Sequence, residues 1–130
     1  MCEPRIADEE VVYLRIPDSS PWFESPDRIT TANFKLSRKR GDLGLSVYRN
    51  KIVSLDDVIA KPGATPGCFL TAATVGDIRG LTDGRGKPLC LDVVAVDDDD
   101  DPGHAEIRGP EPGKLNRSAS KALCDLFKRI

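Results

Sequence analysis

The chain has 130 residues, which is enough for one compact domain. Hydrophobic residues make up 39% and charged residues 31%, so the chain can bury a core, and wholesale disorder is excluded. Its 11 Gly and 10 Pro follow no period, which excludes a collagen-like or coiled-coil chain. With 19 basic and 21 acidic residues the formal net charge is −2, so the molecule as a whole lacks the positive excess typical of nucleic-acid-binding proteins.

The sequence predicts neither a membrane protein nor a metal site. No apolar run approaches the ~20 residues that a membrane span needs, and the polar residues 1–5 do not resemble the start of a signal peptide. Zinc ligands usually come in closely spaced pairs, whereas the cysteines here are far apart and there is only one histidine. These are Cys2, Cys68, Cys90 and Cys124. We therefore expect reduced thiols, no metal, no membrane contact and a cytoplasmic location.

The N-terminal part of the chain predicts an arm, a strand and a loop, in that order. Residues 1–10 are expected to form a flexible N-terminal arm. Residues 11–16 are mostly apolar and are followed by a proline, which is typical of a strand end. The prolines and serines of residues 18–27 predict a loop, in which Trp22 and Phe23 are expected to pin the loop over the core.

The next segment predicts two more strands and a short helix. Apolar and polar residues alternate over residues 29–36 and again over residues 43–48, which is the pattern of half-buried strands. Ser54 can accept a hydrogen bond from the backbone three residues later, so it is expected to start a helix. Lys61, Pro62 and Gly63 would then end that helix near residue 60.

The following segment predicts strands over residues 68–73, 89–96 and 103–108. Thr74 is expected to cap a second short helix over residues 75–81. Residues 89–96 are almost entirely apolar, so this strand is expected to be covered on both faces and to lie at the centre of the sheet.

The C-terminal segment has the clearest helix pattern, with Asn116 or Ser118 as its cap. Its apolar stripe consists of Ala119, Ala122, Leu123, Leu126, Phe127 and Ile130, with Lys128 and Arg129 in the last turn. Residues 11–130 are thus predicted to form a single α+β domain. Its sheet is mixed or mostly antiparallel, with about six strands, and two short helices and a C-terminal amphipathic helix pack on it.

The alternation of the predicted strands places a set of polar side chains opposite the core. The set contains Arg15, Asn33, Lys35, Ser46, Tyr48, His104, Glu106 and Arg108. Cross-strand neighbours lie about 5 Å apart, so these groups can form a site. The alternative is a solvated face, which antiparallel sheets commonly have.

The charges are distributed unevenly along the chain. Residues 35–51 contain six basic residues and one acidic residue, and residues 114–130 contain five basic residues and one acidic residue. Residues 97–111 show the opposite balance, with seven acidic residues and one basic residue. The aspartate run 97–101 does not fit a calcium loop, because Pro102 stands where such a loop needs glycine, so we expect a solvated acidic loop. A bipolar surface of this kind steers a charged partner.

Our leading hypothesis is a small, non-catalytic module that binds another protein through the polar sheet face and the bipolar charge, with no cofactor. The expected partner-binding residues are Lys35, Arg38, Lys39, Arg40 and Arg49. A nucleic-acid-binding accessory protein that uses the same basic cluster is an alternative.

A compact enzyme acting on a nucleotide-like substrate is the other alternative. Arg15 would hold a phosphate, and Ser46 or Tyr48 would orient a sugar. His104, the only histidine, would carry out acid–base catalysis together with Glu106. No nucleophile motif such as G-x-S-x-G and no phosphate-binding glycine loop occurs in the sequence.

Four segments resemble small bacterial proteins of similar length. They are Tyr-Leu-Arg-Ile-Pro at 13–17, Ala-Asn-Phe-Lys at 32–35, Leu-Ser-Val-Tyr at 45–48 and Gly-His-Ala-Glu-Ile at 103–107. This resemblance implies a bacterial, cytoplasmic protein.

The order of Arg15, Ser46 and Glu106, each on a predicted strand, also resembles the Arg–Ser–Glu class of the ADP-ribosyltransferase superfamily. That resemblance implies that NAD binds in a cleft of a split sheet and contacts these three residues. Two positions depart from the pattern of the class. Leu-Ser-Val at 45–47 stands where the class has Ser-Thr-Ser, and His104 stands where the class has Glu or Gln.

Overall fold

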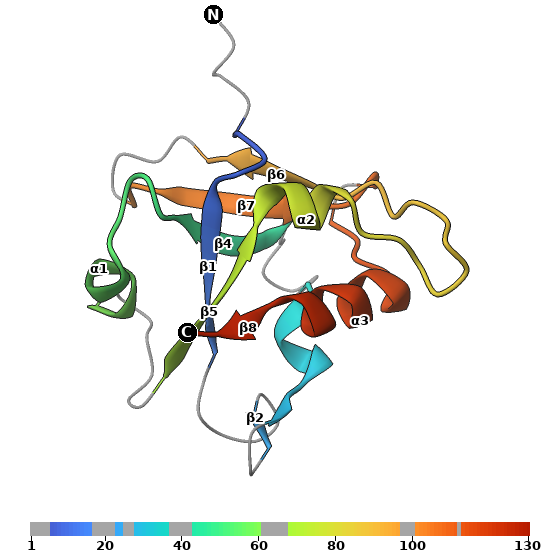
Figure 1. Ribbon diagram of the computed structural model, residues 1–130, viewed down its shortest axis with the longest axis horizontal. Coiled ribbons are helices and arrows are strands. Elements are labelled where there is room, and N and C mark those ends of the chain that lie inside the picture. Colours follow the sequence, from blue (N-terminus) through green and yellow to red (C-terminus); the bar gives the residue numbers. More distant parts are fainter. Residues whose placement is uncertain are drawn as a thin grey trace, which may run out of the picture.

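The computed structural model describes residues 6–16, 23–24, 28–36, 43–60, 68–96, 101–111 and 113–130. This part of the chain contains a six-stranded antiparallel sheet and three α-helices, the last of them near the C-terminus (Figure 1). The predicted α+β fold with a mostly antiparallel sheet is therefore confirmed.

The six strands of the main sheet follow the spatial order β6-β7-β4-β1-β5-β8. They are β1 (Val11–Ile16), β4 (Leu45–Arg49), β5 (Phe69–Thr74), β6 (Asp92–Ala95), β7 (His104–Arg108) and β8 (Lys128–Arg129). A separate two-stranded sheet contains β2 (Phe23–Glu24) and β3 (Arg28–Ile29). The helices are α1 (Leu55–Ala60), α2 (Val75–Arg79), α3 (Arg117–Leu126) and the 3-10 helix η1 (Thr31–Phe34).

Side chains on the two faces of the sheet belong to two separate apolar clusters. Val12 and Ile16 of β1 face the larger core, together with side chains of α2, α3 and η1. Tyr13 faces the other side, where it packs with Val58 of α1 and Leu70 of β5. Figure 1 shows α1 on one side of β1, and α2 and α3 on the other. β1 is thus covered on both faces at these positions, and with β4 it lies in the middle of the six-strand order.

Each α-helix begins at the polar residue that the sequence predicts. The Ser54 hydroxyl accepts a hydrogen bond from the backbone N–H of Asp57 at 3.2 Å, and Thr74 accepts one from Asp77 at 3.3 Å. Asn116 accepts the corresponding bond at the start of α3, at 2.8 Å. Such caps satisfy N–H groups that have no partner within the helix.

The predicted strand over residues 29–36 is wrong for most of its length. Only Arg28–Ile29 is a strand, and residues 31–34 form η1. The alternation correctly predicts that Phe34 faces the core. Its side chain is fully buried, and its ring centroid lies 5.6 Å from that of Phe127. The Phe34 carbonyl accepts a hydrogen bond from the Ser120 hydroxyl of α3 at 2.7 Å. This tertiary bond satisfies a backbone group that a strand would have paired with a neighbouring strand.

The apolar run 89–96 does not lie at the centre of the sheet. Its strand, β6, is an edge strand that pairs only with β7 among the described strands. Leu91 and Val93 are buried in the larger core, while Val94, Ala95 and Val96 are only half-buried. The apolar run therefore corresponds to an edge strand that is only partly buried, and not to a central strand.

The end of the C-terminal helix also differs from the prediction. The chain leaves the helix at Phe127, and Lys128 and Arg129 form β8, which pairs with Ala72 and Thr71 of β5. The Phe127 side chain is buried in the larger core, where its ring packs on that of Phe34.

The expected N-terminal arm covers residues 1–10, of which residues 6–10 are described and pack against the domain. Ile6 is buried in the larger core, and its carbonyl accepts a hydrogen bond from Arg79 at 2.6 Å. Arg79 also contacts Asp8 at 2.6 Å and Asp92 at 2.7 Å. Burial alone would lower the pKa of Arg79, but these two carboxylates outweigh it and raise the pKa, which keeps the side chain charged.

Candidate functional site

Six of the eight predicted polar residues lie on one face of the sheet, on β1, β4 and β7. They are Arg15, Ser46, Tyr48, His104, Glu106 and Arg108. Tyr48 is directly opposite His104 in the ladder, and Ser46 is directly opposite Glu106. The other two members of the predicted set are not on the sheet, since Asn33 is part of η1 and Lys35 follows it.

Ser46 and His104 are in hydrogen-bond contact on this face. The Ser46 hydroxyl oxygen and the His104 Nε2 atom are 3.0 Å apart. On the other side of the imidazole, Nδ1 lies 4.0 Å from a carboxylate oxygen of Asp101. That same oxygen accepts a hydrogen bond from the Tyr48 hydroxyl at 3.0 Å. The Ser46 hydroxyl, the His104 imidazole and the Asp101 carboxylate are therefore arranged in a row, with the imidazole in the middle.

A tight turn brings Asp101 next to His104. The backbone N–H of His104 donates to the Asp101 carbonyl at 3.2 Å, which closes a four-residue turn. Pro102 is its second residue, and Gly103, with φ of 82°, is its third. A proline followed by a residue with positive φ is the pattern of a type II turn. The sequence analysis counted Asp101 only as part of the acidic run, although Asp-Pro-Gly-His was the signal for this pairing.

A hollow of about 320 Å³ opens where β1 and β4 diverge. The two strands pair only at Val12 with Arg49 and at Tyr13 with Tyr48, so their far ends are not held together by the ladder. The hollow is lined by Leu14, Arg15, Lys35, Leu36, Gly44, Leu45, Ser46 and Tyr48. It therefore contains a hydroxyl nucleophile candidate and two cationic side chains.

Glycine at position 44 is required by the same strand arrangement. A Cβ atom there would lie 2.7 Å from the Ile107 carbonyl oxygen and 2.9 Å from the Glu106 Cβ. Such contacts are closer than non-bonded atoms tolerate, so the glycine allows β4 to approach β7 at the rim of the hollow.

Glu106 does not belong to the residues that line the hollow. Its carboxylate accepts hydrogen bonds from Arg108 at 2.6 and 3.0 Å. The structure thus brings Arg15 and Ser46 to one hollow and leaves Glu106 beside it, paired with an arginine on its own strand.

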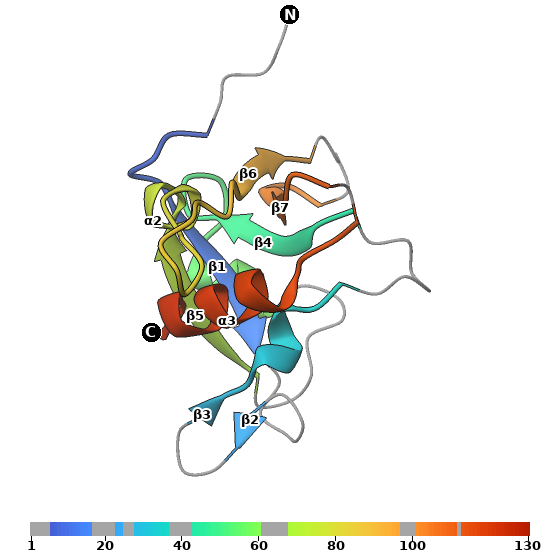
Figure 2. The same cartoon turned by 90° about the vertical axis from the view of Figure 1, so that its right-hand side faces the viewer.

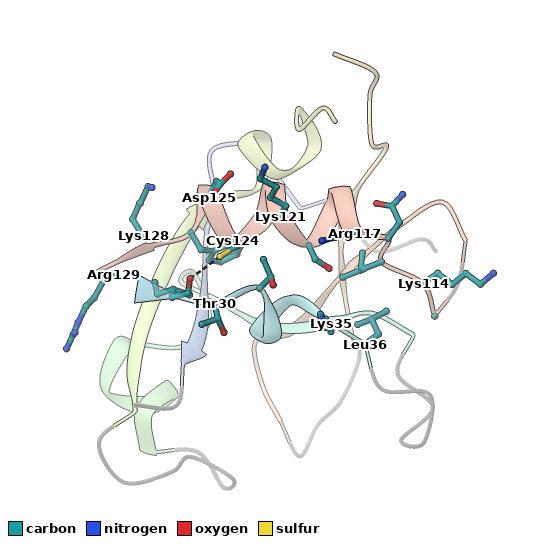
Figure 3. A pocket seen from close by; sticks show the side chains of 17 residues that line it. Thr30, Lys35, Leu36, Lys114, Arg117, Lys121, Cys124, Asp125, Lys128 and Arg129 are labelled. Atoms are coloured by element: carbon teal, nitrogen blue, oxygen red, sulfur yellow. Dashed lines mark hydrogen bonds between the residues drawn. The ribbon is translucent and has the colours of Figure 1, made fainter. Parts of the chain in front are cut away.

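A second and larger concave surface lies between η1 and α3, which Figure 2 shows side by side. We call it the basic groove; its volume is about 1540 Å³. Its cationic lining residues are Lys35, Lys114, Arg117, Lys121, Lys128 and Arg129, all exposed, against one carboxylate, that of Asp125. In Figure 3, Lys128 and Arg129 lie at one end and Lys114 at the other. The groove also has apolar lining, from Ile29, Leu36, Leu115 and Phe127.

Side-chain contacts hold the two walls of the basic groove together. The Cys124 thiol of α3 donates to the Ile29 carbonyl at 3.3 Å (Figure 3). Ser120 donates to the Phe34 carbonyl, and the Phe34 and Phe127 rings pack in the core beneath. The walls are thus fixed relative to each other, so the groove exists before any ligand binds.

The predicted partner-binding residues are only partly brought together. Lys35 lines both the hollow and the basic groove. Arg49 instead forms an ion pair with the buried Glu10, at 2.6 and 2.9 Å. Arg38, Lys39 and Arg40 lie outside the described residues, as do Trp22 and the aspartates 97–100.

The sequence analysis did not predict the basic groove as a site, although it noted the five basic residues of 114–130. The excess of basic residues in this segment was the sequence feature that could have indicated a basic surface. The partner wall, from Ile29 to Leu36, could not be placed because it was expected to be a strand of the sheet.

Within the described residues, no group of three or more His, Cys, Asp or Glu side chains is arranged to hold a metal ion. No helix in that part of the chain has both the length and the hydropathy needed to cross a membrane. Comparison of the chain with protein-family models, with curated proteins and with solved structures finds no match. The two resemblances noted in the sequence therefore stay predictions.

Proposed function

We propose that this chain is a binding module that holds an acidic segment of a partner protein in the basic groove. The observation that carries the proposal is a set of four exposed cations around the groove. Within the described part of the chain, no carboxylate pairs with Lys35, Arg117, Lys121 or Lys128. Like charges placed together on one surface repel one another, and an anionic ligand relieves that repulsion.

The lining of the basic groove favours a peptide over a nucleic acid. Proteins that bind single strands stack bases on exposed aromatic rings, whereas the aromatic residue that lines this groove, Phe127, is buried. The apolar side chains of Ile29, Leu36 and Leu115 suit apolar side chains placed between acidic ones.

The length of α3 sets the size of the segment. Its 10 residues span about 15 Å along the helix axis. An extended peptide rises about 3.3 Å per residue, so about five residues of the partner would lie along the helix. An exposed site of this size is expected to bind with modest affinity and fast association.

The experiment is a fluorescence-anisotropy titration with a labelled peptide of alternating Glu and Leu residues. The double variant Arg117→Glu/Lys121→Glu should weaken binding about tenfold or more, since two attractive contacts become repulsive. The matched control is Lys51→Glu/Lys87→Glu, which makes the same change in net charge at exposed positions outside the groove. Equal binding by both double variants, or no binding by the unmodified chain, would contradict the proposal.

The same titration separates the nucleic-acid alternative from this proposal. A labelled oligothymidine should bind more weakly than the Glu-Leu peptide at equal charge, because the groove offers no exposed ring for stacking. Tighter binding of the oligonucleotide, lost in the groove variant, would assign the basic groove to nucleic acid.

A nucleotide-processing enzyme is a second candidate, because Arg15 and Ser46 line the same hollow. A ligand that binds only the folded chain raises its unfolding midpoint. A thermal-shift screen with NAD and ATP tests this candidate directly: a rise that Arg15→Met abolishes would support it, and no rise at millimolar nucleotide would count against it.

A further inference from the structure

We propose that Ser46 is a nucleophile that His104 activates as a general base, with Asp101 as a positioning residue, and that the hollow beside them receives an ester carrying an anionic group. The inference does not depend on the basic groove, because its reacting groups, Ser46, His104 and Asp101, are not among the residues that line the groove, although Lys35 and Leu36 line both concave surfaces.

The geometry of the three groups carries the inference. Ser46 is exposed, so its hydroxyl can reach a ligand, and its oxygen lies 3.0 Å from His104 Nε2. Hydrogen-bond contact between nucleophile and base is the first requirement for an activated serine. The His104 side chain is only 16% exposed and the Asp101 side chain 28%, so the fold holds the base more firmly than a free surface histidine.

Asp101 is placed to select the reactive form of the imidazole. For His104 Nε2 to accept the serine proton, the neutral ring must carry its own proton on Nδ1. Nδ1 faces the Asp101 carboxylate at 4.0 Å, and the Tyr48 hydroxyl anchors that carboxylate. Contacts of this kind are often longer in the free protein and shorten when substrate binds.

The chemical steps balance without any added reagent except water. The Ser46 hydroxyl proton moves to His104 Nε2 while the oxygen forms a bond to the ester carbonyl carbon. The bond from that carbon to the leaving alkoxide then breaks, and the alkoxide takes the proton from His104. Water next gives a proton to His104 while its oxygen forms a bond to the acyl carbon. The bond from that carbon to the Ser46 oxygen then breaks, which releases the carboxylic acid, and His104 returns its proton to the Ser46 oxygen.

The hollow defines the substrate class. Its volume of about 320 Å³ is at the lower end of small-molecule sites, which begin near 300 Å³. Arg15 and Lys35 line it together with Ser46. These cations can stabilise the oxyanion of the tetrahedral intermediate and a carboxylate or phosphate on the substrate. A short-chain ester with one negative charge fits both the size and the charge.

The primary test is covalent labelling of the full chain with diisopropyl fluorophosphate, followed by intact-mass and peptide mass spectrometry. In this reaction the Ser46 oxygen bonds to phosphorus, fluoride leaves, and His104 takes the hydroxyl proton. We expect one added diisopropylphosphoryl group on Ser46, absent in Ser46→Ala. Ser118→Ala is the matched control, because Ser118 is an exposed serine outside the hollow and should not affect labelling.

The role of the base is tested with His104→Gln, which keeps a hydrogen-bonding group beside Ser46 but accepts protons poorly. Loss of a positioned base lowers rates by about a hundredfold or more. The labelling rate of the folded variant, with folding checked by circular dichroism, should fall by that factor. An unchanged rate in His104→Gln, or equal labelling of several serines in the unmodified chain, would overturn the proposal.

Positioning by Asp101 has its own readout. Asp101→Asn should slow labelling of Ser46, and Asp101→Glu should restore part of the rate, while the unfolding midpoints of the two variants stay similar. A purely structural role would change the midpoint and leave the labelling rate of the folded chain unaltered, which would remove Asp101 from the scheme.

The substrate class is tested by ester hydrolysis. The 4-nitrophenyl monoester of succinate should be hydrolysed faster than 4-nitrophenyl acetate, and Arg15→Met should lower the ratio of the two rates. Equal rates for both esters would contradict the anionic preference, and an Arg15-independent preference would assign it to other residues.

Discussion

At the scale of single residues, Gly103 controls how close Asp101 and His104 come. Its φ of 82° is in the left-handed region, where a side chain costs about 1–2 kcal/mol. A Cβ atom at this position would also lie 3.0 Å from a methyl group of the buried Val53. Position 103 therefore requires glycine for two reasons, the positive φ of the backbone and the lack of space for a side chain next to Val53.

Three glycine-to-alanine variants separate these demands in urea unfolding. Gly103→Ala should lower the free energy of unfolding by about 2 kcal/mol or more. Gly86→Ala, with φ of 83° and open space around it, should cost about 1 kcal/mol from conformation alone. Gly84→Ala, which has neither demand, should change stability by under about 0.5 kcal/mol. Equal costs at Gly103 and Gly86 would show that Val53 does not crowd the turn.

The ion pair between Arg49 and Glu10 is the second residue-scale feature. Glu10 is 3% exposed and receives two hydrogen bonds from the guanidinium group. Removing one partner of a buried pair costs about 3–5 kcal/mol, because it leaves an uncompensated charge out of water.

We expect Arg49→Met to lower the free energy of unfolding by about 3 kcal/mol. The matched control is Lys114→Met, which breaks the exposed pair with Glu111 and should cost under about 1 kcal/mol. Both values come from chemical denaturation of the purified variants. A loss of under about 1 kcal/mol in Arg49→Met would show that the pair with Glu10 does not stabilise the fold.

At the scale of elements, the sequence predicts the helix starts better than the strands. Ser54, Thr74 and Asn116 act through local hydrogen bonds that a spacing of three residues already encodes. The helix η1 and the edge position of β6 depend on distant partners, namely Ser120 for the Phe34 carbonyl and β7 for the edge. No local pattern encodes such partners, so the alternation at 29–36 predicts a strand where the structure has η1.

The cap of α3 gives an element-scale prediction. Asn116→Ala removes the side-chain acceptor of the Ala119 N–H and should cost about 1 kcal/mol of stability. Asn116→Asp keeps an acceptor and adds a favourable charge at the helix start, so its stability should match the unmodified chain. Thermal unfolding followed by circular dichroism measures both. A similar loss in both variants would show that the amide has another role.

At the scale of the whole molecule, both candidate sites join segments that are distant in the sequence. Strand parity predicted that Ser46 and His104 share a face, because each lies on a correctly assigned strand. The hollow could not be predicted, since it results from the divergence of β1 and β4. The basic groove likewise needs η1 beside α3, and the hydrogen bonds that join its two walls connect residues 86 and 95 positions apart, which composition does not reveal.

The charge of the basic groove predicts a strong salt dependence. Exposed charges are screened beyond about 10 Å at 0.1 M salt. Binding of the Glu-Leu peptide should therefore weaken about tenfold between about 0.05 and 0.5 M sodium chloride. Anisotropy titrations at several salt concentrations measure this slope, and a flat profile would indicate that the apolar lining, not the charge, holds the peptide.

The most direct test of the central proposal is to locate the bound peptide on the protein by two-dimensional ¹H–¹⁵N NMR. We predict that the Glu-Leu peptide shifts the backbone amide signals of Thr31, Lys35, Arg117 and Lys121 most, since these residues line the two walls of the basic groove. Largest shifts at Ser46 and His104 on the polar sheet face, or no shifts with saturating peptide, would contradict the account.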